Sequence, residues 1–185
     1  MPIHWSSKKE CRSFYKNLCA EKFAQGLVQN QGQLNTVLLQ FLNQEQGLWG
    51  AYKALSQEAS VDVATQSRLD WVFPRMVGQE LEFCRAHSFS QGSYGVLEPS
   101  ADSPAVSLSD VQGLLIPGLV FNKNGTRLGK GKGFYDKALA TYQGKKVGVC
   151  FDFQISDKLI PAEAHDIGMD FIITESGLID CRKQK

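Results

Sequence analysis

The sequence predicts a single α/β domain, residues 1–185, with three layers: a mainly parallel central sheet and helices on both of its faces. Short apolar runs rich in branched and aromatic residues recur along the chain, and helical or turn-rich segments separate them. Strands that are buried on both faces of a parallel sheet have this continuous apolar character. A chain of 185 residues also suits one domain with a sizeable core. The expected strands lie within residues 47–55, 69–74, 81–86, 113–121, 145–153 and 170–174.

A first helix is expected to begin after Ser7 and to end near Gly26. Ser7 and Glu10 form the S-x-x-E pattern of a capping box, in which each side chain bonds a backbone N–H at the helix start. From Cys11 to Phe23, apolar residues recur at helical spacing, and glycine commonly ends a helix. Further helices are expected over residues 33–46 and 134–142, and a loop is expected over residues 103–110.

The composition is ordinary for a soluble globular protein, with 43% hydrophobic and 21% charged residues. The formal net charge of +1 provides no global field that would attract nucleic acid or membranes, so we expect neither as a partner. The five cysteines form no C-x-x-C pair, which argues against a disulfide framework or a structural zinc site and for a reducing compartment. With no secretory leader and no apolar run of membrane-spanning length, the sequence predicts a cytoplasmic protein.

The segment NGTRLGKGKGFYD, residues 124–136, has the chemistry of an anion-binding loop. Its four glycines let the backbone approach an anion closely, and Arg127, Lys130 and Lys132 can donate charge-assisted hydrogen bonds. The segment joins an expected strand to an expected helix, and open parallel sheets bind ligands at the carboxyl ends of their strands. It is neither a Walker A sequence nor a dinucleotide fingerprint. The alternative is a flexible basic surface loop.

Two features near this loop allow more than one interpretation. A polyphosphate would repel Asp136 unless a cation lay between them, so Asp136 is either a magnesium ligand or an aspartate that stabilises the first turn of the helix. Lys8, Arg12 and Lys16 fall four residues apart and share one helix face. From periodicity alone, such a face is typical of a solvated basic surface.

Six motifs follow one another along the chain. The most specific is RLGKGKGFYDKAL, residues 127–139, and a K-x-x-x-R pair at Lys8 and Arg12 begins the first helix. Together they resemble the signature segments of the 5-formyltetrahydrofolate cyclo-ligase family, also called the methenyltetrahydrofolate synthetases. The resemblance extends from about residue 8 to residue 175, and it is strong from residue 92 onward. The other motifs are FPRM at 73–76, GSYGVLEP at 92–99, LLIPGLVFNKNG at 114–125 and IPAEAHDIGMDFIITE at 160–175.

The resemblance implies a Rossmann-like sheet and a defined reaction. Members of the family use ATP and magnesium to convert 5-formyltetrahydrofolate to 5,10-methenyltetrahydrofolate, with release of ADP and phosphate. Phosphorylation of the formyl oxygen makes it a good leaving group, and the neighbouring folate nitrogen then attacks and closes the ring. Positioning and electrostatics carry most of such a transfer. The expected ligands are therefore ATP, Mg²⁺ and a reduced folate, bound by an enzyme that we expect to be a monomer.

The same resemblance assigns roles to individual residues. Arg127, Lys130 and Lys132 are expected to be catalytic: Lys130 and Lys132 stand where the family keeps basic groups near the phosphates and the formyl group, and Arg127 begins the segment that resembles the nucleotide loop. Asp136 and Asp166 are expected on the magnesium side. The residues expected to bind ATP are Lys8, Arg12, Arg127, Leu128, Gly129, Lys130, Gly131, Lys132, Gly133, Phe134 and Tyr135. The residues expected to bind the substrate are Leu55, Ser60, Tyr94, Lys130 and Phe134.

Some of these roles replace or compete with other interpretations. For Lys8 and Arg12, the resemblance favours binding of ATP over a solvated surface. Tyr94 stands where the family often has tryptophan, and it either stacks on the pterin ring or packs in the core. His165 either orients Asp166 or has a structural role.

One departure from the family pattern motivates a rival function. Ser60 stands where the family has a glutamate that contacts the substrate, although Glu58 or Asp62 could supply that carboxylate. Loss of such a partner at a buried site costs about 1–3 kcal/mol. The rival is an ATP-using enzyme that acts on another formamide-like or carboxylate substrate. A non-catalytic nucleotide-binding protein is a second alternative, and the presence of Asp136 and Asp166 argues against it. An RNA-binding function is the weakest candidate.

Overall fold

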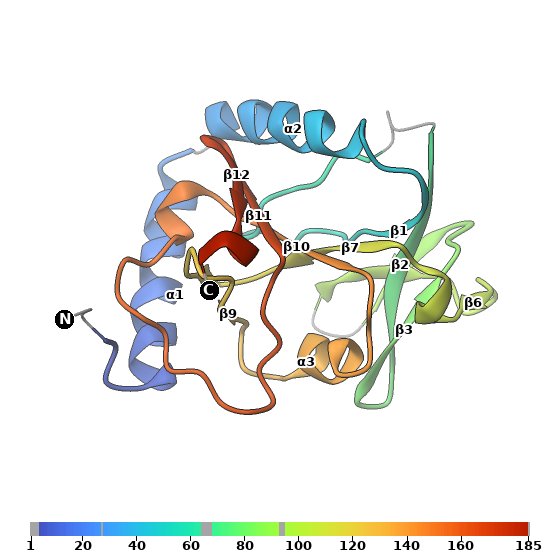
Figure 1. Cartoon of the computed structure of the whole chain (residues 1–185). Coiled ribbons are helices and arrows are strands. Elements are labelled where there is room, and N and C mark those ends of the chain that lie inside the picture. Colours follow the sequence, from blue (N-terminus) through green and yellow to red (C-terminus); the bar gives the residue numbers. More distant parts are fainter. Residues whose placement is uncertain (1–3, 27, 64–67, 93–94, 185) are drawn as a thin grey trace.

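An eight-stranded sheet forms the centre of the computed structural model, which describes residues 4–26, 28–63, 68–92 and 95–184 (Figure 1). The strand order is β12-β11-β10-β7-β1-β2-β3-β6. Five adjacent strands in the middle of the sheet run parallel to one another. These strands are β1 (Gly47–Gly50), β2 (Leu69–Val77), β7 (Gly113–Pro117), β10 (Lys145–Val149) and β11 (Phe171–Thr174).

The outer strands of the sheet are antiparallel, a feature that the apolar pattern did not predict. On one side β12 (Gly177–Asp180) pairs with β11, and on the other β3 (Glu80–Cys84) pairs with β2 and with β6 (Ala105–Val106). The chain turns from β2 into β3 at Gly78, whose φ of 63° lies in the left-handed region that favours glycine. Two short ladders complete the strands: β4 (Phe89–Gln91) with β5 (Leu97–Pro99), and β8 (Val120–Phe121) with β9 (Arg127–Leu128).

The parallel strands have the doubly wound order of an open α/β sheet. Numbered by their sequence, they lie side by side in the order 2-1-3-4-5, so the direction of winding reverses between β1 and β7. Ligands of such sheets bind outside the carboxyl ends of the strands at this reversal. The prediction of a mainly parallel, Rossmann-like sheet is therefore confirmed for its five central strands.

Helices cover both faces of the sheet, which confirms the three layers. Side chains of β7 alternate between the faces: Leu115 packs in one core with Leu38 of α2 (Val28–Leu42), whereas Leu114 and Ile116 pack in the other with Leu139 of α3 (Phe134–Leu139). This alternation is the period of two that a strand imposes on its side chains. In Figure 1, α2 lies above the sheet and α3 lies below it.

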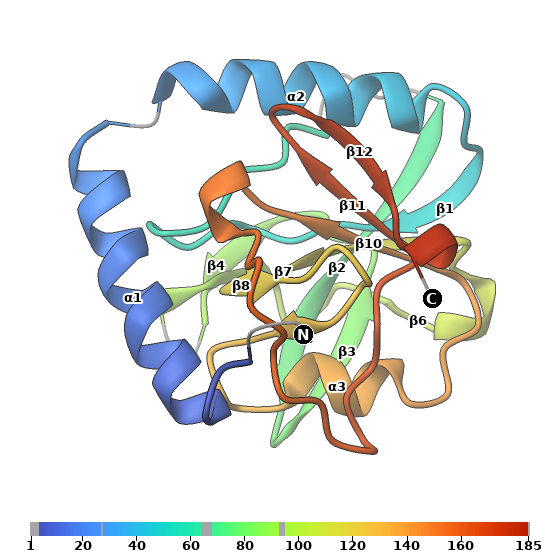
Figure 2. The same cartoon turned by 60° about the vertical axis from the view of Figure 1, so that its left-hand side comes forward.

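The first helix, α1 (Lys8–Ala24), lies to one side of these layers. Ser7 caps the helix as expected, because its Oγ accepts a hydrogen bond from the backbone N–H of Glu10 at 3.1 Å. The Glu10 carboxylate instead bonds the backbone N–H of Ser6, one residue before the position that a capping box predicts. In Figure 2, the chain segment before β11, in orange to red, passes from beside α1 to α3.

Several predicted boundaries differ from the observed ones. The second helix begins and ends earlier than residues 33–46, and β1 ends at Gly50 although the apolar run continues to Leu55. The expected loop over residues 103–110 contains β6 and a short 3₁₀ helix (Leu108–Asp110). Two further 3₁₀ helices span Asp152–Gln154 and Cys181–Gln184. Within the described part of the chain, we find no helix that is both long and apolar enough to cross a membrane.

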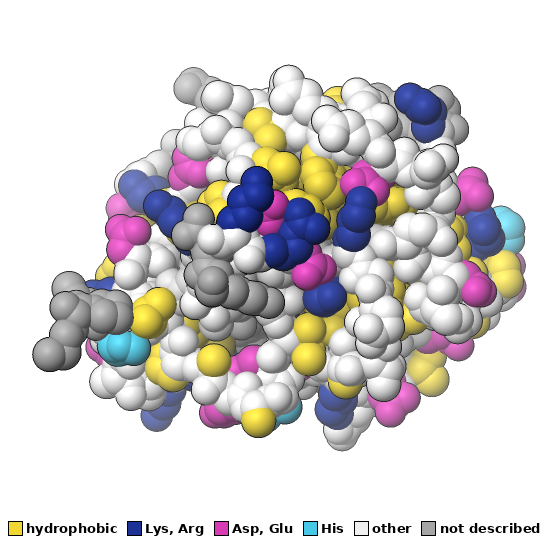
Figure 3. Space-filling model, viewed as in Figure 1, with side chains coloured by type: hydrophobic (Ala, Val, Ile, Leu, Met, Phe, Trp, Pro, Cys, Tyr) yellow, Lys and Arg dark blue, Asp and Glu magenta, His cyan; other side chains and the backbone are white. Residues whose placement is uncertain are grey.

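Charges of both signs are interleaved on the face of the molecule that Figure 3 shows. Lysine and arginine side chains gather near its middle, with acidic side chains among them. Ion pairs in the structure show the same interleaving of charge: Lys145 Nζ lies 2.7 Å from Glu45 Oε1, and Lys146 Nζ lies 3.2 Å from Asp170 Oδ2. This interleaving agrees with the small net charge.

Candidate active site

A cavity of about 1050 Å³ lies beyond the carboxyl ends of β1 and β7, at the reversal of the sheet. Residues 52–58, which follow β1, form one wall, and Pro117 and Gly118 at the end of β7 lie next to them. Further lining residues come from the glycine-rich loop and α3, from α1 and the 163–167 segment, and from β2, β3, β5 and the residues before β5. The lining residues that the sequence predicted are Lys8, Arg12, Leu55, every residue from Arg127 to Tyr135, Asp136 and Asp166.

The glycine-rich loop runs from β9 to α3 along the rim of the cavity. Gly131 and Gly133 have φ values of 102° and 70°, which L side chains rarely adopt. Gly133 is also the residue before the first turn of α3. The loop rests on the first helix, because Arg12 Nε donates to the carbonyl oxygen of Gly129 at 3.2 Å. The glycines thus keep the loop backbone open to the cavity.

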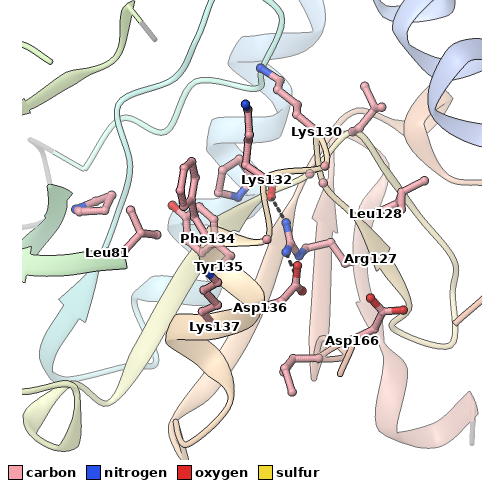
Figure 4. A pocket seen from close by; sticks show the side chains of 18 of the residues that line it. Leu81, Arg127, Leu128, Lys130, Lys132, Phe134, Tyr135, Asp136, Lys137 and Asp166 are labelled. Carbon is pink, nitrogen blue, oxygen red and sulfur yellow. Dashed lines mark hydrogen bonds and ion pairs between the residues drawn. The ribbon is translucent and has the colours of Figure 1, made fainter. Parts of the chain in front are cut away.

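Arg127 is held rigidly at the base of this loop. Its side chain is only 3% exposed; Nη1 donates to the Pro117 carbonyl at 3.2 Å, and Nη2 donates to Asp136 Oδ1 at 3.0 Å (Figure 4). The guanidinium carbon lies 5.5 Å from the centre of the Tyr135 ring. Among the described residues, nothing accepts a hydrogen bond from the buried Nε. Arg127 is therefore a fixed cation whose orientation depends on Asp136.

Lys130 joins the loop to the wall after β1. Its Nζ lies 2.8 Å from Glu58 Oε1, and the second oxygen of Glu58 accepts the backbone N–H of Leu55 at 3.0 Å. Both carboxylate oxygens of Glu58 are therefore engaged by protein groups. Glu58 thus brings a carboxylate to the cavity from the turn after β1. In the family pattern, the glutamate of this turn stands two residues later, at the position of Ser60.

Lys8 and Asp166 form the closest ion pair in the cavity, although they lie far apart in the sequence. Lys8 Nζ is 2.6 Å from Asp166 Oδ2 and 3.0 Å from Glu163 Oε2. Burial alone would lower the pKa of Lys8, but the hydrogen bonds to Asp166 and Glu163 outweigh it, and the pKa is raised. Burial alone would raise the pKa of Asp166, but the bonds from Lys8 and from the Glu163 N–H outweigh it, and the pKa is lowered.

His165 lies beside this pair at the surface, with 73% of its side chain exposed. Its Nε2 is 3.2 Å from Glu163 Oε2 and 3.9 Å from Asp166 Oδ1, so its nearer contact is with Glu163. One ligand atom from each of these three residues lies within 4.8 Å of the other two. The two carboxylates offer the oxygen ligands that magnesium prefers.

Two residues considered for the substrate side, Ser60 and Asp62, lie outside the cavity lining. Ser60 is exposed, and its backbone exchanges two hydrogen bonds with the Gln31 side chain, at 2.7 and 2.9 Å. Asp62 is exposed and likewise lies outside the cavity lining. Tyr94 lies outside the described residues.

Other lining residues were not predicted as site residues. Glu163 stands three residues before Asp166, and this spacing within one motif was the available signal. Lys53 lies in a segment without a motif, whereas Glu98 lies in the GSYGVLEP motif, residues 92–99, in which only Tyr94 was assigned a role. Lys53 Nζ lies 4.3 Å from the centre of the Phe89 ring. These residues meet at the cavity through the packing of segments that lie far apart in the sequence.

The model of the 5-formyltetrahydrofolate cyclo-ligase family matches residues 53–175, more than half of the chain. The chain belongs to this family. A probable 5-formyltetrahydrofolate cyclo-ligase of Schizosaccharomyces pombe is 26% identical over 146 residues, which are 69% of this chain and 72% of that protein. The 5-formyltetrahydrofolate cyclo-ligase of Mycolicibacterium smegmatis is 34% identical over 93 residues, about half of each chain (48% and 47%).

Solved structures of the family have the same fold. The 5,10-methenyltetrahydrofolate synthetase of Aquifex aeolicus superposes with a TM-score of 0.76 at 26% identity, and the match covers 95% of this chain and 93% of that one. The synthetase of Mycoplasma pneumoniae has a TM-score of 0.69 at 23% identity, with 87% and 96% covered, which supports the fold alone. Membership of the cyclo-ligase family makes the protein an enzyme, a ligase of folate one-carbon metabolism.

Proposed function

We propose that the protein converts 5-formyltetrahydrofolate to 5,10-methenyltetrahydrofolate with ATP and magnesium, and releases ADP and phosphate. One observation carries the proposal: the five basic side chains that the sequence predicted as site residues line one cavity together with an open glycine-rich backbone and the carboxylates of Asp136 and Asp166. This arrangement suits a polyphosphate, because charge-assisted hydrogen bonds and close backbone N–H groups both favour anions. The five basic residues are Lys8, Arg12, Arg127, Lys130 and Lys132.

The reaction needs positioned positive charge more than it needs a nucleophile on the protein. The formyl oxygen takes the γ-phosphoryl group, ADP leaves, and the neighbouring folate nitrogen then attacks the formyl carbon as phosphate leaves. Charge develops on the phosphate oxygens during the first step, and fixed donors stabilise it without reorganisation. Arg127 is such a donor, because Asp136 and the Pro117 carbonyl fix its guanidinium before any ligand binds.

Lys130 and Lys132 extend this positive field along the loop. Lys130 connects the phosphate side to the substrate side through its contact with Glu58. We assign Lys130 to the transferred phosphoryl group and the formyl oxygen. Lys8 and Arg12 line the cavity from the first helix, and we assign them to the nucleotide phosphates. Leu55 and Phe134 line the same cavity and offer apolar contacts to the folate ring.

Magnesium fits the carboxylate side of the cavity. We propose that Asp166 and Glu163 hold the ion together with phosphate oxygens and water, since magnesium is usually bound by one or two carboxylates and substrate phosphates. The ion would neutralise phosphate charge. Lys8, which bonds both carboxylates, balances their charge within the protein. Asp136 bonds Arg127, and this contact favours a positioning role for Asp136.

The position of Ser60 outside the cavity lining keeps a second candidate in view, an ATP-using enzyme with another formamide-like or carboxylate substrate. Measurement of substrate-dependent ADP release separates the two. Purified protein with ATP and magnesium should release ADP when 5-formyltetrahydrofolate is added, and should not do so with other N-formyl compounds or with carboxylates. ADP release with one of those compounds, and none with the folate, would favour the second candidate.

Two wider expectations belong to the same proposal. None of the five cysteines, all of which the structure describes, forms a disulfide, which favours a reducing compartment such as the cytoplasm. A monomer is the expected state, because one chain supplies every group assigned above. Size-exclusion chromatography with light scattering checks it, and a mass that is a multiple of 20.5 kDa would contradict it.

A further inference from the structure

The side of the cavity away from the basic loop is mostly apolar, but it contains one buried carboxylate and the ammonium group of Lys53, which lies over the Phe73 and Phe89 rings. In Figure 4, Leu81 lies across the cavity from Arg127 and Asp166, with Phe134 and Tyr135 between them. The carboxylate belongs to Glu98, which lines the cavity and is only 8% exposed. Its apolar neighbours in the cavity lining come from β2, β3 and the segment before β5: Pro74, Met76, Leu81 and Val96.

The carboxylate of Glu98 is poorly satisfied by the protein. From the described residues it receives one hydrogen bond, from the backbone N–H of Met76 to Oε2, at a long 3.3 Å. No described lysine, arginine or histidine forms an ion pair with it. A buried charge with so little compensation is unfavourable unless another group supplies hydrogen bonds. Because Glu98 faces a cavity, a bound ligand can supply them.

The local backbone keeps Glu98 in this place. It pairs with Ser90 in the β4–β5 ladder, which fixes its position along the strand. A methyl group at Gly92 would overlap with the Glu98 carboxyl group, so the absence of a side chain at Gly92 makes room for it. Glu98 is therefore held within a paired strand and not on a free loop.

Glu98 differs in this respect from the other carboxylate on the substrate side. Lys130 and the Leu55 N–H engage both oxygens of Glu58, whereas Glu98 has an oxygen to offer. A carboxylate accepts two parallel N–H bonds well, and the apolar side chains around it suit the faces of a flat ring. The matching ligand is a heterocycle with adjacent amino and amide N–H donors, as on the pyrimidine ring of a reduced folate.

We propose that Glu98 determines substrate specificity by accepting hydrogen bonds from the amino and amide N–H groups of the folate ring. The inference rests on the proposed function and adds to it the group that distinguishes this substrate. Glu98 does not touch the transferred phosphoryl group, which lies on the basic side of the cavity. Its removal therefore weakens folate binding and leaves ATP binding unchanged.

The test compares full-length wild-type protein with Glu98→Gln, which keeps the shape and replaces one acceptor oxygen by a donor. Calorimetry measures the Kd of 5-formyltetrahydrofolate and, separately, of ATP with magnesium. We expect roughly a tenfold or larger increase in the folate Kd, an ATP Kd within about twofold of wild type, and no loss of thermal stability. Glu80→Gln, at an exposed position at the start of β3, is the matched control and should change neither Kd.

Two further measurements separate recognition from a structural effect. An analogue that lacks the ring amino group should bind wild type more weakly than the natural folate, and Glu98→Gln should lose most of this difference. Gly92→Ala, which displaces the Glu98 carboxyl group, should reproduce the Glu98→Gln phenotype. A Glu98→Gln protein that keeps wild-type folate affinity and discrimination would overturn the assignment of Glu98 alone. A wild-type protein that binds no reduced folate would overturn the proposed function, and the assignment of Glu98 with it.

Discussion

Nη2 of Arg127 lies 3.0 Å from Oδ1 of Asp136, and the two residues connect the end of the β8–β9 hairpin to the first turn of α3. The guanidinium is almost fully buried, so its orientation is set by this carboxylate and by the Pro117 carbonyl. An arginine held in this way is a preorganised donor for developing phosphate charge. Asp136 therefore positions Arg127 within the protein and also lines the cavity itself.

A double-mutant cycle tests whether Arg127 and Asp136 act as a unit. Arg127→Ala and Asp136→Ala should each lower kcat/KM strongly, and the double variant should be much less impaired than the two losses combined. We expect a coupling energy of at least about 1 kcal/mol, since the residues are in direct contact. Strictly additive losses would mean that Asp136 acts separately, for example on a metal ion.

Lys130→Met should impair catalysis without destabilising the fold. The Lys130 side chain is 41% exposed, and an ion pair this exposed contributes about 0–1 kcal/mol to stability. The activity should fall at least about tenfold, because a charge-assisted contact to the reacting groups is lost. The matched control is Lys145→Met: Lys145 is 47% exposed and paired with Glu45 at 2.7 Å, but it lies outside the cavity lining. Similar activity losses in both variants would contradict the role of Lys130.

The Lys8–Asp166 pair makes stability depend on pH at both extremes. The folded pKa of Asp166 is below its ordinary value of 3.8, so its contribution is present above pH 3.8 and is lost as the pH falls through the folded pKa. The folded pKa of Lys8 is above 10.5, so its contribution is present below pH 10.5 and is lost as the pH rises through the folded pKa. The unfolding free energy should therefore fall in strong acid and in strong base.

Asp166→Asn should remove part of the fall in unfolding free energy that acid causes. Urea unfolding of wild type between about pH 5 and about pH 3 should give a falling free energy, and the variant should give a shallower fall. Asp70→Asn, at an aspartate with 70% of its side chain exposed, is the control and should follow wild type. An identical slope in Asp166→Asn and wild type would show that the pair does not contribute to stability.

The cysteines should be unreactive in the folded protein. None of the five forms a disulfide and all are buried, and burial raises the pKa of Cys11 and of Cys19 to about 11. Since the thiolate is the reactive form, both thiols should remain protonated and slow at neutral pH. A thiol reagent such as DTNB should label none of the five rapidly in buffer and all five in denaturant. Fast labelling of the folded protein would contradict the burial of these residues.

Local signals were enough to predict α1, the parallel strands and the glycine-rich loop. Ser7 with Glu10 marked a helix start, and Pro117-Gly118 marked the end of β7, because capping and chain-breaking are properties of neighbouring residues. The antiparallel β3 was not predicted as such. A short apolar run carries no information on strand direction, which the turn at Gly78 determines here.

The contacts within the site depend on packing, and the sequence could not give them. Lys8 and Asp166 are 158 residues apart in the chain and meet only because α1 lies beside the 163–167 segment. Glu58, one of the two carboxylates on the substrate side, is another example. Alignment to the family pattern pointed to Ser60, whereas the turn after β1 brings Glu58 into the cavity. The alternative of Glu58 had been open from the sequence, and only the fold could favour it.

We propose that this one cavity carries out both phosphoryl transfer from ATP and ring closure of a formyl folate. The most direct measurement follows methenyl-folate absorbance and ADP in the same sample of purified protein, with 5-formyltetrahydrofolate, ATP and magnesium. We expect that both products appear in equal amounts, that neither forms without ATP, and that Arg127→Ala abolishes both. ADP release without methenyl-folate, or absorbance that rises without ATP, would contradict it.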